Sequence, residues 1–211
     1  MSFVRATVQD AAIGVAVADA PEDLKAFLKP GCAAAIWRRR HSADFQGWVN
    51  ALDPSNLPQG RVVLVPDTVR SNMAELCEMS KTPSCPQRAQ LINDVASLAD
   101  IFADLMQTPY LRLRLAAVRT NACRKFHIDA ITGRLVCTYR GIGTQYGISR
   151  NGQDPSRVFT VPTGSPILLR GTLWPEKPAS GLLHRSPPIE GMGETRLVLV
   201  LDALSDLEEE A

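Results

Sequence analysis

The sequence lacks an excess of positive or negative charge. Its 211 residues contain 23 Lys and Arg against 22 Asp and Glu, which gives a formal charge of +1 at pH 7. Because affinity for nucleic acid rests on a basic face, this balance argues against a nucleic-acid partner. No apolar run reaches the roughly 18–20 residues of a membrane helix, so we expect no membrane partner. Residues 1–10 lack the pattern of a signal peptide, and we expect a cytoplasmic protein.

Paired cysteines and several common catalytic motifs are absent as well. The five cysteines are odd in number, and no two have CxxC spacing. Free thiols are therefore expected, rather than disulfides or a zinc site built from cysteine alone. The sequence has no GxSxG elbow, no P-loop and no GxGxxG, so nothing supports a hydrolase, NTPase or Rossmann-type protein. The composition is that of a globular protein long enough to bury a full core.

Residues 1–110 predict a mixture of helices and short strands that packs on the second half of the chain. Apolar or β-branched runs predict strands at residues 33–37 and 61–65. Residues 42–52 suit a short helix with Ser42 as its N-cap. The clearest helix begins at Pro86, because apolar residues then recur at steps of three and four until Pro109 stops the pattern.

From Leu111 onward the hydrophobic period changes to two, which is typical of half-buried strands. The expected strands are residues 111–115, 134–139, 157–161, 167–169 and 196–201. Residues 141–166 are rich in Gly, Pro, Asn and Asp and are expected to be mostly loop. The fold class is therefore α+β, with an antiparallel sandwich or barrel over residues 111–204 and an acidic tail at 205–211.

Two of the three histidines suggest a metal site. His127 and Asp129 are two residues apart, so on an extended strand both side chains project from the same face. His184 follows 57 residues after His127. Two imidazoles and one carboxylate occupy one face of a metal and leave the other open, as in non-haem Fe(II) oxygenases. The alternative is a hydrogen-bonded histidine at a strand end beside a carboxylate that accepts in a turn.

Arg196 begins the last apolar strand, twelve residues after His184. It shares a strand face with Val198 and Val200, while Leu197 and Leu199 are expected to pack on helices. A buried guanidinium on such a face is costly unless a carboxylate meets it. The alternative places Arg196 at the strand mouth with its guanidinium in water.

These residues together resemble two families. The first is the double-stranded β-helix (jelly-roll or cupin-like) of Fe(II)/2-oxoglutarate-dependent oxygenases, with the prolyl-hydroxylase-like branch nearest. The motifs that carry this resemblance are Phe126-His-Ile-Asp129, a strand ending in Tyr139, the turn Gly141-Ile-Gly-Thr144, then His184 and Arg196, within about Leu111 to Asp202. The second is an uncharacterised bacterial family of unknown function with the signatures C-x-x-x-H-x-D, T-Y-x-G-x-G-T and H-R-S-P-P. It implies a functional link to metal-chaperone GTPases of zinc homeostasis.

The oxygenase resemblance implies roles for individual residues. His127, Asp129 and His184 would be ligands of Fe(II). Arg196 would pair with the distal carboxylate of 2-oxoglutarate, and Tyr139 would give the same carboxylate a hydroxyl contact. The implied activity is a hydroxylase-type dioxygenase that converts this co-substrate to succinate while oxidising an unknown small-molecule or protein substrate. In the family the arginine usually follows the distal histidine by about ten residues, and this sequence departs from that spacing.

Two other functions stay open at this stage. One is a non-catalytic metal-binding barrel in zinc or other metal homeostasis, with Cys123 as a fourth ligand. For Cys123 we favour a small buried residue over a ligand, because free cysteines are usually part of the core. The other is a cupin-like scaffold without metal. The basic run Arg38-Arg39-Arg40-His41 is expected to be solvated.

Overall fold

The structure is a computed structural model that describes residues 11–121, 123–150 and 152–206. Its helices are α1 (Ala43–Ala51), α2 (Val69–Met79) and α3 (Pro86–Met106), with 3-10 helices η1 (Pro21–Leu28), η2 (Pro54–Asn56) and η3 (Pro66–Thr68). Its strands are β1 (Gly14–Ala18), β2 (Cys32–Trp37), β3 (Gly60–Leu64), β4 (Tyr110–Val118), β5 (Gly133–Arg140), β6 (Gln145–Ile148), β7 (Phe159–Thr160), β8 (Pro166–Arg170), β9 (Leu182–Arg185) and β10 (Arg196–Leu204). This mixed helix and strand content fits the expected α+β class.

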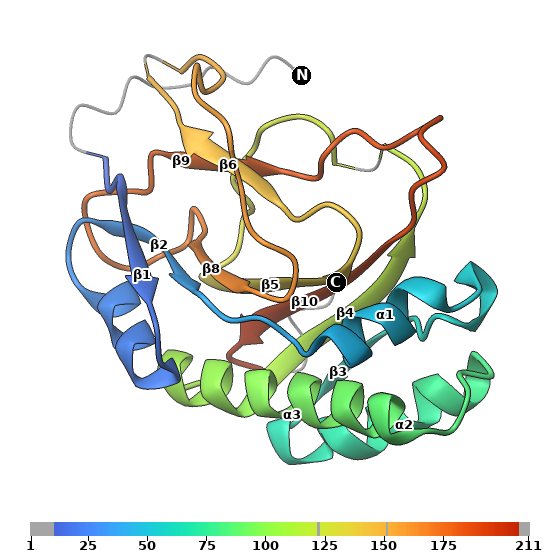
Figure 1. The fold of residues 1–211 in the computed structure, drawn as a ribbon. Coiled ribbons are helices and arrows are strands. Elements are labelled where there is room, and N and C mark those ends of the chain that lie inside the picture. The colour runs from blue at the N-terminus through green and yellow to red at the C-terminus, as the bar shows by residue number, and fades with distance from the viewer. Residues whose placement is uncertain (1–10, 122, 151, 207–211) are drawn as a thin grey trace.

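The strands form a large and a small sheet. The large sheet has seven strands in the order β1-β2-β8-β5-β10-β4-β3, and the small sheet has three in the order β7-β6-β9. Every strand pair is antiparallel except β1 with β2. Figure 1 shows the helices on one side of the large sheet and β6 and β9 on the other. The first 110 residues supply β1, β2 and β3, so the large sheet runs across both halves of the chain.

The large sheet buries both of its faces. On the helical face, Leu197, Leu199 and Leu201 of β10 join a core cluster with the apolar side of α3. On the other face, Val198 and Val200 join a second cluster with residues of the small sheet, such as Leu182. The alternation along β10 is therefore the one expected from its sequence, and it turns Arg196 away from the helices.

Several expected elements are present with nearly the expected bounds. Ser42 caps α1 by accepting a hydrogen bond from the backbone N–H of Phe45 at 3.2 Å. Helix α3 begins at Pro86 and ends at Met106, where Gln107 takes a left-handed conformation. The sequence did not predict α2, β1, β6 and β9, nor the three 3-10 helices. Among the described residues, no helix is long and apolar enough to cross a membrane.

Candidate metal centre

Backbone pairing brings the two candidate histidines together. His127 lies in a loop segment and forms an isolated antiparallel bridge with His184 of β9. The N–H of each residue donates to the carbonyl of the other at 3.0 Å. Asp129 follows two residues after His127, and its carbonyl accepts from the N–H of Thr172 at 2.9 Å. The three expected ligands thus come from two segments that are far apart in the sequence, and Thr172 holds the segment that carries Asp129.

The three side chains converge at distances that suit one cation. Nε2 of His184 lies 3.0 Å from Oδ2 of Asp129, and Nε2 of His127 lies 3.6 Å from Oδ1. One potential ligand atom from each residue lies within 4.8 Å of the others. Metal–ligand bonds of about 2.1 Å place neighbouring ligand atoms about 3 Å apart. The spacing of the donors therefore fits a single metal ion with an open side.

One further observation favours a metal over a plain ion-pair cluster. Nδ1 of His127 lies 2.8 Å from the carbonyl oxygen of Lys125. A backbone carbonyl at this nitrogen fixes the tautomer and leaves Nε2 free to act as a ligand.

Sequence analysis did not identify Arg134, which holds Asp129 in place. Nη1 of Arg134 lies 2.6 Å from Oδ2 of Asp129. On its other side the guanidinium makes a two-pronged pair with Asp202, with Nε donating to Oδ1 at 2.6 Å and Nη2 to Oδ2 at 2.9 Å. Arg134 and Asp202 are opposite one another in the register of β5 and β10. The large sheet thus supports the carboxylate of the candidate site.

The electrostatics keep Asp129 and His184 in the forms that metals bind. Burial raises the pKa of Asp129, but hydrogen bonds with His127 and His184 and the charge of Arg134 lower it more, so the net pKa is well below its usual range. Asp129 is therefore a carboxylate at neutral pH. Burial lowers the pKa of His184, which favours its neutral imidazole. The hydrogen bond with Asp129 raises the pKa of His127.

Arg196 is buried and has no carboxylate partner among the described residues. Its exposed fraction is 1%, which contradicts a position in water at the strand mouth. Nε donates to the carbonyl of Ile142 at 2.6 Å, and Nη2 lies 3.3 Å from Oγ1 of Thr138. Burial lowers the pKa of Arg196 to about 10. A charge buried with only neutral partners is costly, so this guanidinium is suited to receive an anion.

One cavity of about 400 Å³ contains both features. It is lined by His127, Asp129, His184, Arg196, Thr144, Val136, Val198 and Val200, among others. The floor of the cavity is the face of β4, β5 and β10 that is turned away from the helices, and β9 supplies part of its roof. A small diacid in this cavity would have the candidate metal ligands and the buried guanidinium within one enclosed space.

Two expectations about individual residues are wrong. Tyr139 faces the helical layer, where its hydroxyl donates to Oδ2 of Asp94 at 2.6 Å. It cannot contact a ligand beside Arg196, because neighbouring residues on a strand point to opposite faces and Thr138 is the one that reaches Arg196. Cys123 is exposed rather than buried, since it lies in the loop at the edge of the cavity.

The sequence also matches a known family over most of its length. Residues 18–202 match the family described as protein of unknown function (DUF1826). The chain belongs to the DUF1826 family. None of the curated proteins matches the DUF1826 chain in sequence. The family match agrees with the expectation of a family of unknown function.

Solved structures similar to the DUF1826 chain include oxygenases. Dioxygenase for auxin oxidation 1 from Arabidopsis thaliana, in a binary complex with 2-oxoglutarate, gives a TM-score of 0.52 at 10% identity over 93% of this chain and 94% of that chain. An oxidoreductase of the 2OG-Fe(II) oxygenase family from Burkholderia pseudomallei gives 0.44 at 14% identity over 89% and 92%. At these identities the comparisons show a shared fold and nothing more. The statement about the fold rests on the Arabidopsis enzyme, whose TM-score is above 0.5.

Proposed function

We propose that this DUF1826 protein is an Fe(II)/2-oxoglutarate-dependent oxygenase of the hydroxylase type. The observation that carries the proposal is the pairing, in one cavity, of a His-Asp-His cluster with a buried arginine that lacks a carboxylate partner among the described residues. A metal-binding site alone gives no reason for burying Arg196. The fold shared with an enzyme solved with 2-oxoglutarate supports the same function. In this proposal the two sheets correspond to a double-stranded β-helix.

Each residue of the site has a distinct task in this function. His127 and His184 would hold Fe(II) through Nε2, and Asp129 would hold it through its carboxylate. When bound, the iron supplies the redox chemistry by which 2-oxoglutarate and O2 yield succinate and CO2 while one oxygen atom enters the substrate. Arg196 and Thr138 would bind the distal carboxylate and fix the orientation of the co-substrate. Arg134 keeps Asp129 ionised and oriented.

The cavity wall limits the access of water. Val136, Val198 and Val200 form an apolar floor between Arg196 and the metal ligands. An apolar lining strengthens the pairing of a carboxylate with a guanidinium, because fewer water molecules compete for either group. The arrangement therefore favours a ligand with one anionic end at Arg196 and a metal-chelating end at the His-Asp-His cluster.

The proposal is tested by separating metal binding from co-substrate binding. Protein purified without oxygen is loaded with Fe(II), and 2-oxoglutarate affinity and succinate formation are measured. His184→Ala should lose stoichiometric metal. Arg196→Lys should keep its metal but bind 2-oxoglutarate at least tenfold more weakly, because lysine does not reproduce a planar two-pronged pair. Arg140→Lys is the matched control, since Arg140 donates to the carbonyl of Leu52 outside the cavity.

A failure of the wild-type protein to bind 2-oxoglutarate while it still binds metal would reject the oxygenase. The second candidate, a metal-binding barrel in zinc or other metal homeostasis, would then take its place. One observation favours that candidate: Cys123 is exposed and lines the same cavity as the histidines. In that case Cys123→Ser should weaken zinc binding, whereas an iron site of two histidines and a carboxylate should tolerate the change.

A further inference from the structure

Arginine dominates the charged lining of the cavity. Among the described residues that line it, four are arginines and only Asp129 is acidic. Arg134 is engaged with Asp129 and Asp202. Arg185 donates to Oε1 of Gln145 at 2.8 Å and stacks on the ring of Phe126. With Arg196 assigned to the co-substrate in the proposed function, one arginine of the lining is still without a role.

That arginine is Arg114 of β4. No acidic side chain in the described part of the chain pairs with it. It lies directly opposite Arg61 of β3 in the sheet register, and like charges at opposed positions destabilise a sheet. An anion bound at Arg114 would lower the positive charge at this pair of positions. With no carboxylate beside it in the described residues, the Arg114 guanidinium is available to such an anion.

Arg114 cannot serve the same carboxylate as Arg196. In the register of β10 with β4, Arg196 is opposite Val118, whereas Arg114 is opposite Val200. Four residues along a strand correspond to about 13 Å. The side chain of Arg196 turns to Ile142 and Thr138. The two arginines thus stand at opposite ends of the cavity floor.

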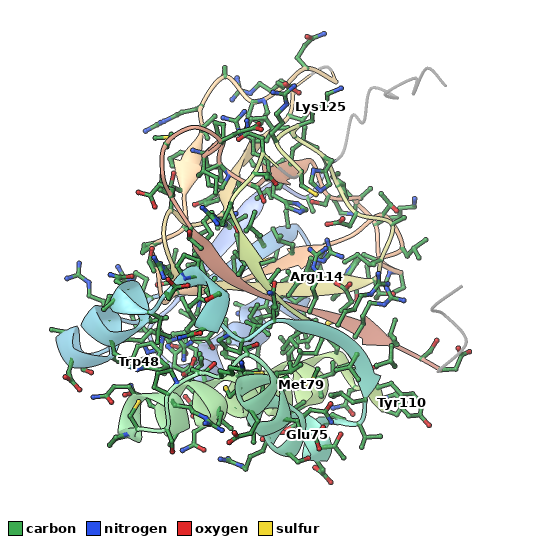
Figure 2. All side chains as sticks on the ribbon, turned by 90° about the vertical axis from the view of Figure 1, so that its right-hand side faces the viewer. Trp48, Glu75, Met79, Tyr110, Arg114 and Lys125 are labelled. Atoms are coloured by element: carbon green, nitrogen blue, oxygen red, sulfur yellow. The ribbon has the colours of Figure 1, made fainter. Side chains whose placement is uncertain are left out.

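Arg114 also lies at the open end of the cavity. The core cluster between the two sheets contains residues of β10, β5 and β8 but none of β3 or β4, so the small sheet leaves this end uncovered. Arg114 is exposed. In Figure 2 it lies on the side of the sheet away from Met79 of α2 and toward the part of the chain that carries Lys125. Arg114 is therefore one of the exposed residues that a ligand entering from solvent can contact.

We propose that Arg114 binds an anionic group of the oxidised substrate. This inference rests on the proposed function, which places 2-oxoglutarate at the other end of the cavity. Val200 of β10 is opposite Arg114, and Val136 of β5 is opposite Val200, so these two apolar residues of the floor lie between Arg114 and the part of β5 that holds Asp129 through Arg134. The substrate class is therefore a small organic anion with an apolar body, whose carboxylate or phosphate pairs with Arg114 while the apolar part reaches toward the metal.

The test uses probes that share a phenyl ring and differ in the charge or type of the polar group. Protein loaded with Fe(II) without oxygen and saturated with 2-oxoglutarate is titrated by calorimetry with phenylacetate, phenyl phosphate and the neutral phenylacetamide. At least one anion should bind, and phenylacetamide should bind at least tenfold more weakly than phenylacetate if the group is a carboxylate. Tighter binding of phenyl phosphate would identify the group as a phosphate. Arg114→Gln should weaken anion binding at least tenfold and leave 2-oxoglutarate affinity unchanged within about twofold.

Arg61→Gln is the matched control. It removes the same charge from the opposed position on β3, but Arg61 does not line the cavity, so anion affinity should change less than threefold. The inference is overturned if neither anion binds, if phenylacetamide binds as tightly as both anions, or if the two variants lose equal affinity. If the wild type does not bind 2-oxoglutarate, the proposed function fails. The same titrations without 2-oxoglutarate then decide the role of Arg114 separately.

Discussion

Arg134 joins the candidate metal centre to the large sheet. Its guanidinium contacts Asp129 on one side and Asp202 on the other, and the side chain of Asp202 is only 4% exposed. Arg134→Gln should lower metal affinity about 10- to 100-fold, because second-layer partners orient the ligands. It should also lower the free energy of unfolding by about 3–5 kcal/mol, because a buried carboxylate loses its partner. Competition with a chelator and denaturant titration measure the two effects.

Two further variants keep this prediction testable if Arg134→Gln does not fold. Arg134→Lys retains the charge and should recover part of the stability but less of the metal affinity. Arg112→Gln is the control, because Arg112 approaches Asp202 only to 3.9 Å and is not among the described residues that line the cavity. Equal losses of metal affinity in Arg112→Gln and Arg134→Gln would show that the affinity depends on the total positive charge near the site and not on the position of Arg134.

At the residue scale, the candidate ligands could be predicted from the sequence better than the residues that hold them in place. The HxD spacing and the alternation along the last strand made His127, Asp129 and Arg196 candidates, and the resemblance to the oxygenases gave each a role. The role of Tyr139 came from the resemblance alone, and the hydrophobic pattern could not correct it, because both faces of β5 are buried. Arg134 and Asp202 could not be paired, since cross-strand register is fixed only by the folded sheet.

Among the connecting elements, the turn after β8 sets the position of Asp129. A Cβ at Gly171 would lie 1.9 Å from the carbonyl oxygen of Ile131 and 2.8 Å from that of Asp129. Real side chains do not tolerate such contacts with backbone, so Gly171→Ala should displace the segment that carries Asp129. Metal affinity should fall at least tenfold, and the midpoint of thermal unfolding should fall as well. Metal titration and thermal denaturation measure both.

Gly47 provides the matched control for Gly171. It is an exposed residue of α1, and a Cβ there would meet no atom within 4 Å. Gly47→Ala should leave metal affinity unchanged and raise stability by up to about 1 kcal/mol, because alanine favours a helix interior. If Gly171→Ala bound metal as well as Gly47→Ala does, the backbone near Asp129 would not depend on this turn.

An element could be predicted where its own residues carry a long hydrophobic pattern. The apolar repeat of α3 and the alternation of β4 extend over many residues, so their existence and type followed from sequence. Strands β6 and β9 have four residues each and lie in segments rich in turn-forming residues. They exist because they pair with each other, as at Tyr146 and His184. Helix α2 has only three buried positions, which is too weak a stripe to recognise.

At the scale of the whole molecule, a buried polar network ties the helical layer to the large sheet. Arg39 pairs with both carboxylate oxygens of Asp94 on α3, at 2.6 and 2.7 Å. Tyr139 of β5 donates to the same carboxylate. His41 packs between the rings of Phe45 and Tyr139. The basic run was expected to be solvated, but this part of it is enclosed, because Asp94 provides the charge that burial of Arg39 requires.

The burial of His41 predicts a loss of stability in acid. Burial, more than the charge of Arg39, lowers the pKa of His41 below its ordinary value of 6.5, and Asp94 opposes this only in part. Below pH 6.5 the unfolded chain therefore takes up a proton that the folded protein does not, and the free energy of unfolding falls as the pH decreases toward the folded pKa. Above that range both states are neutral, and His41 contributes no pH dependence.

The variant His41→Phe isolates this contribution. Nε2 of His41 is buried without a hydrogen bond among the described residues, so a ring of similar shape should keep the packing and remain within about 1 kcal/mol of wild-type stability at pH 8. Denaturant unfolding of metal-free protein at several pH values should then show a smaller loss between pH 7.5 and 5 in the variant. The other histidines are the same in both proteins, so the difference between the two curves reports His41 alone. Parallel curves would mean that the folded protein protonates His41 as readily as the unfolded chain does, and that the layers can separate enough at this point to admit water.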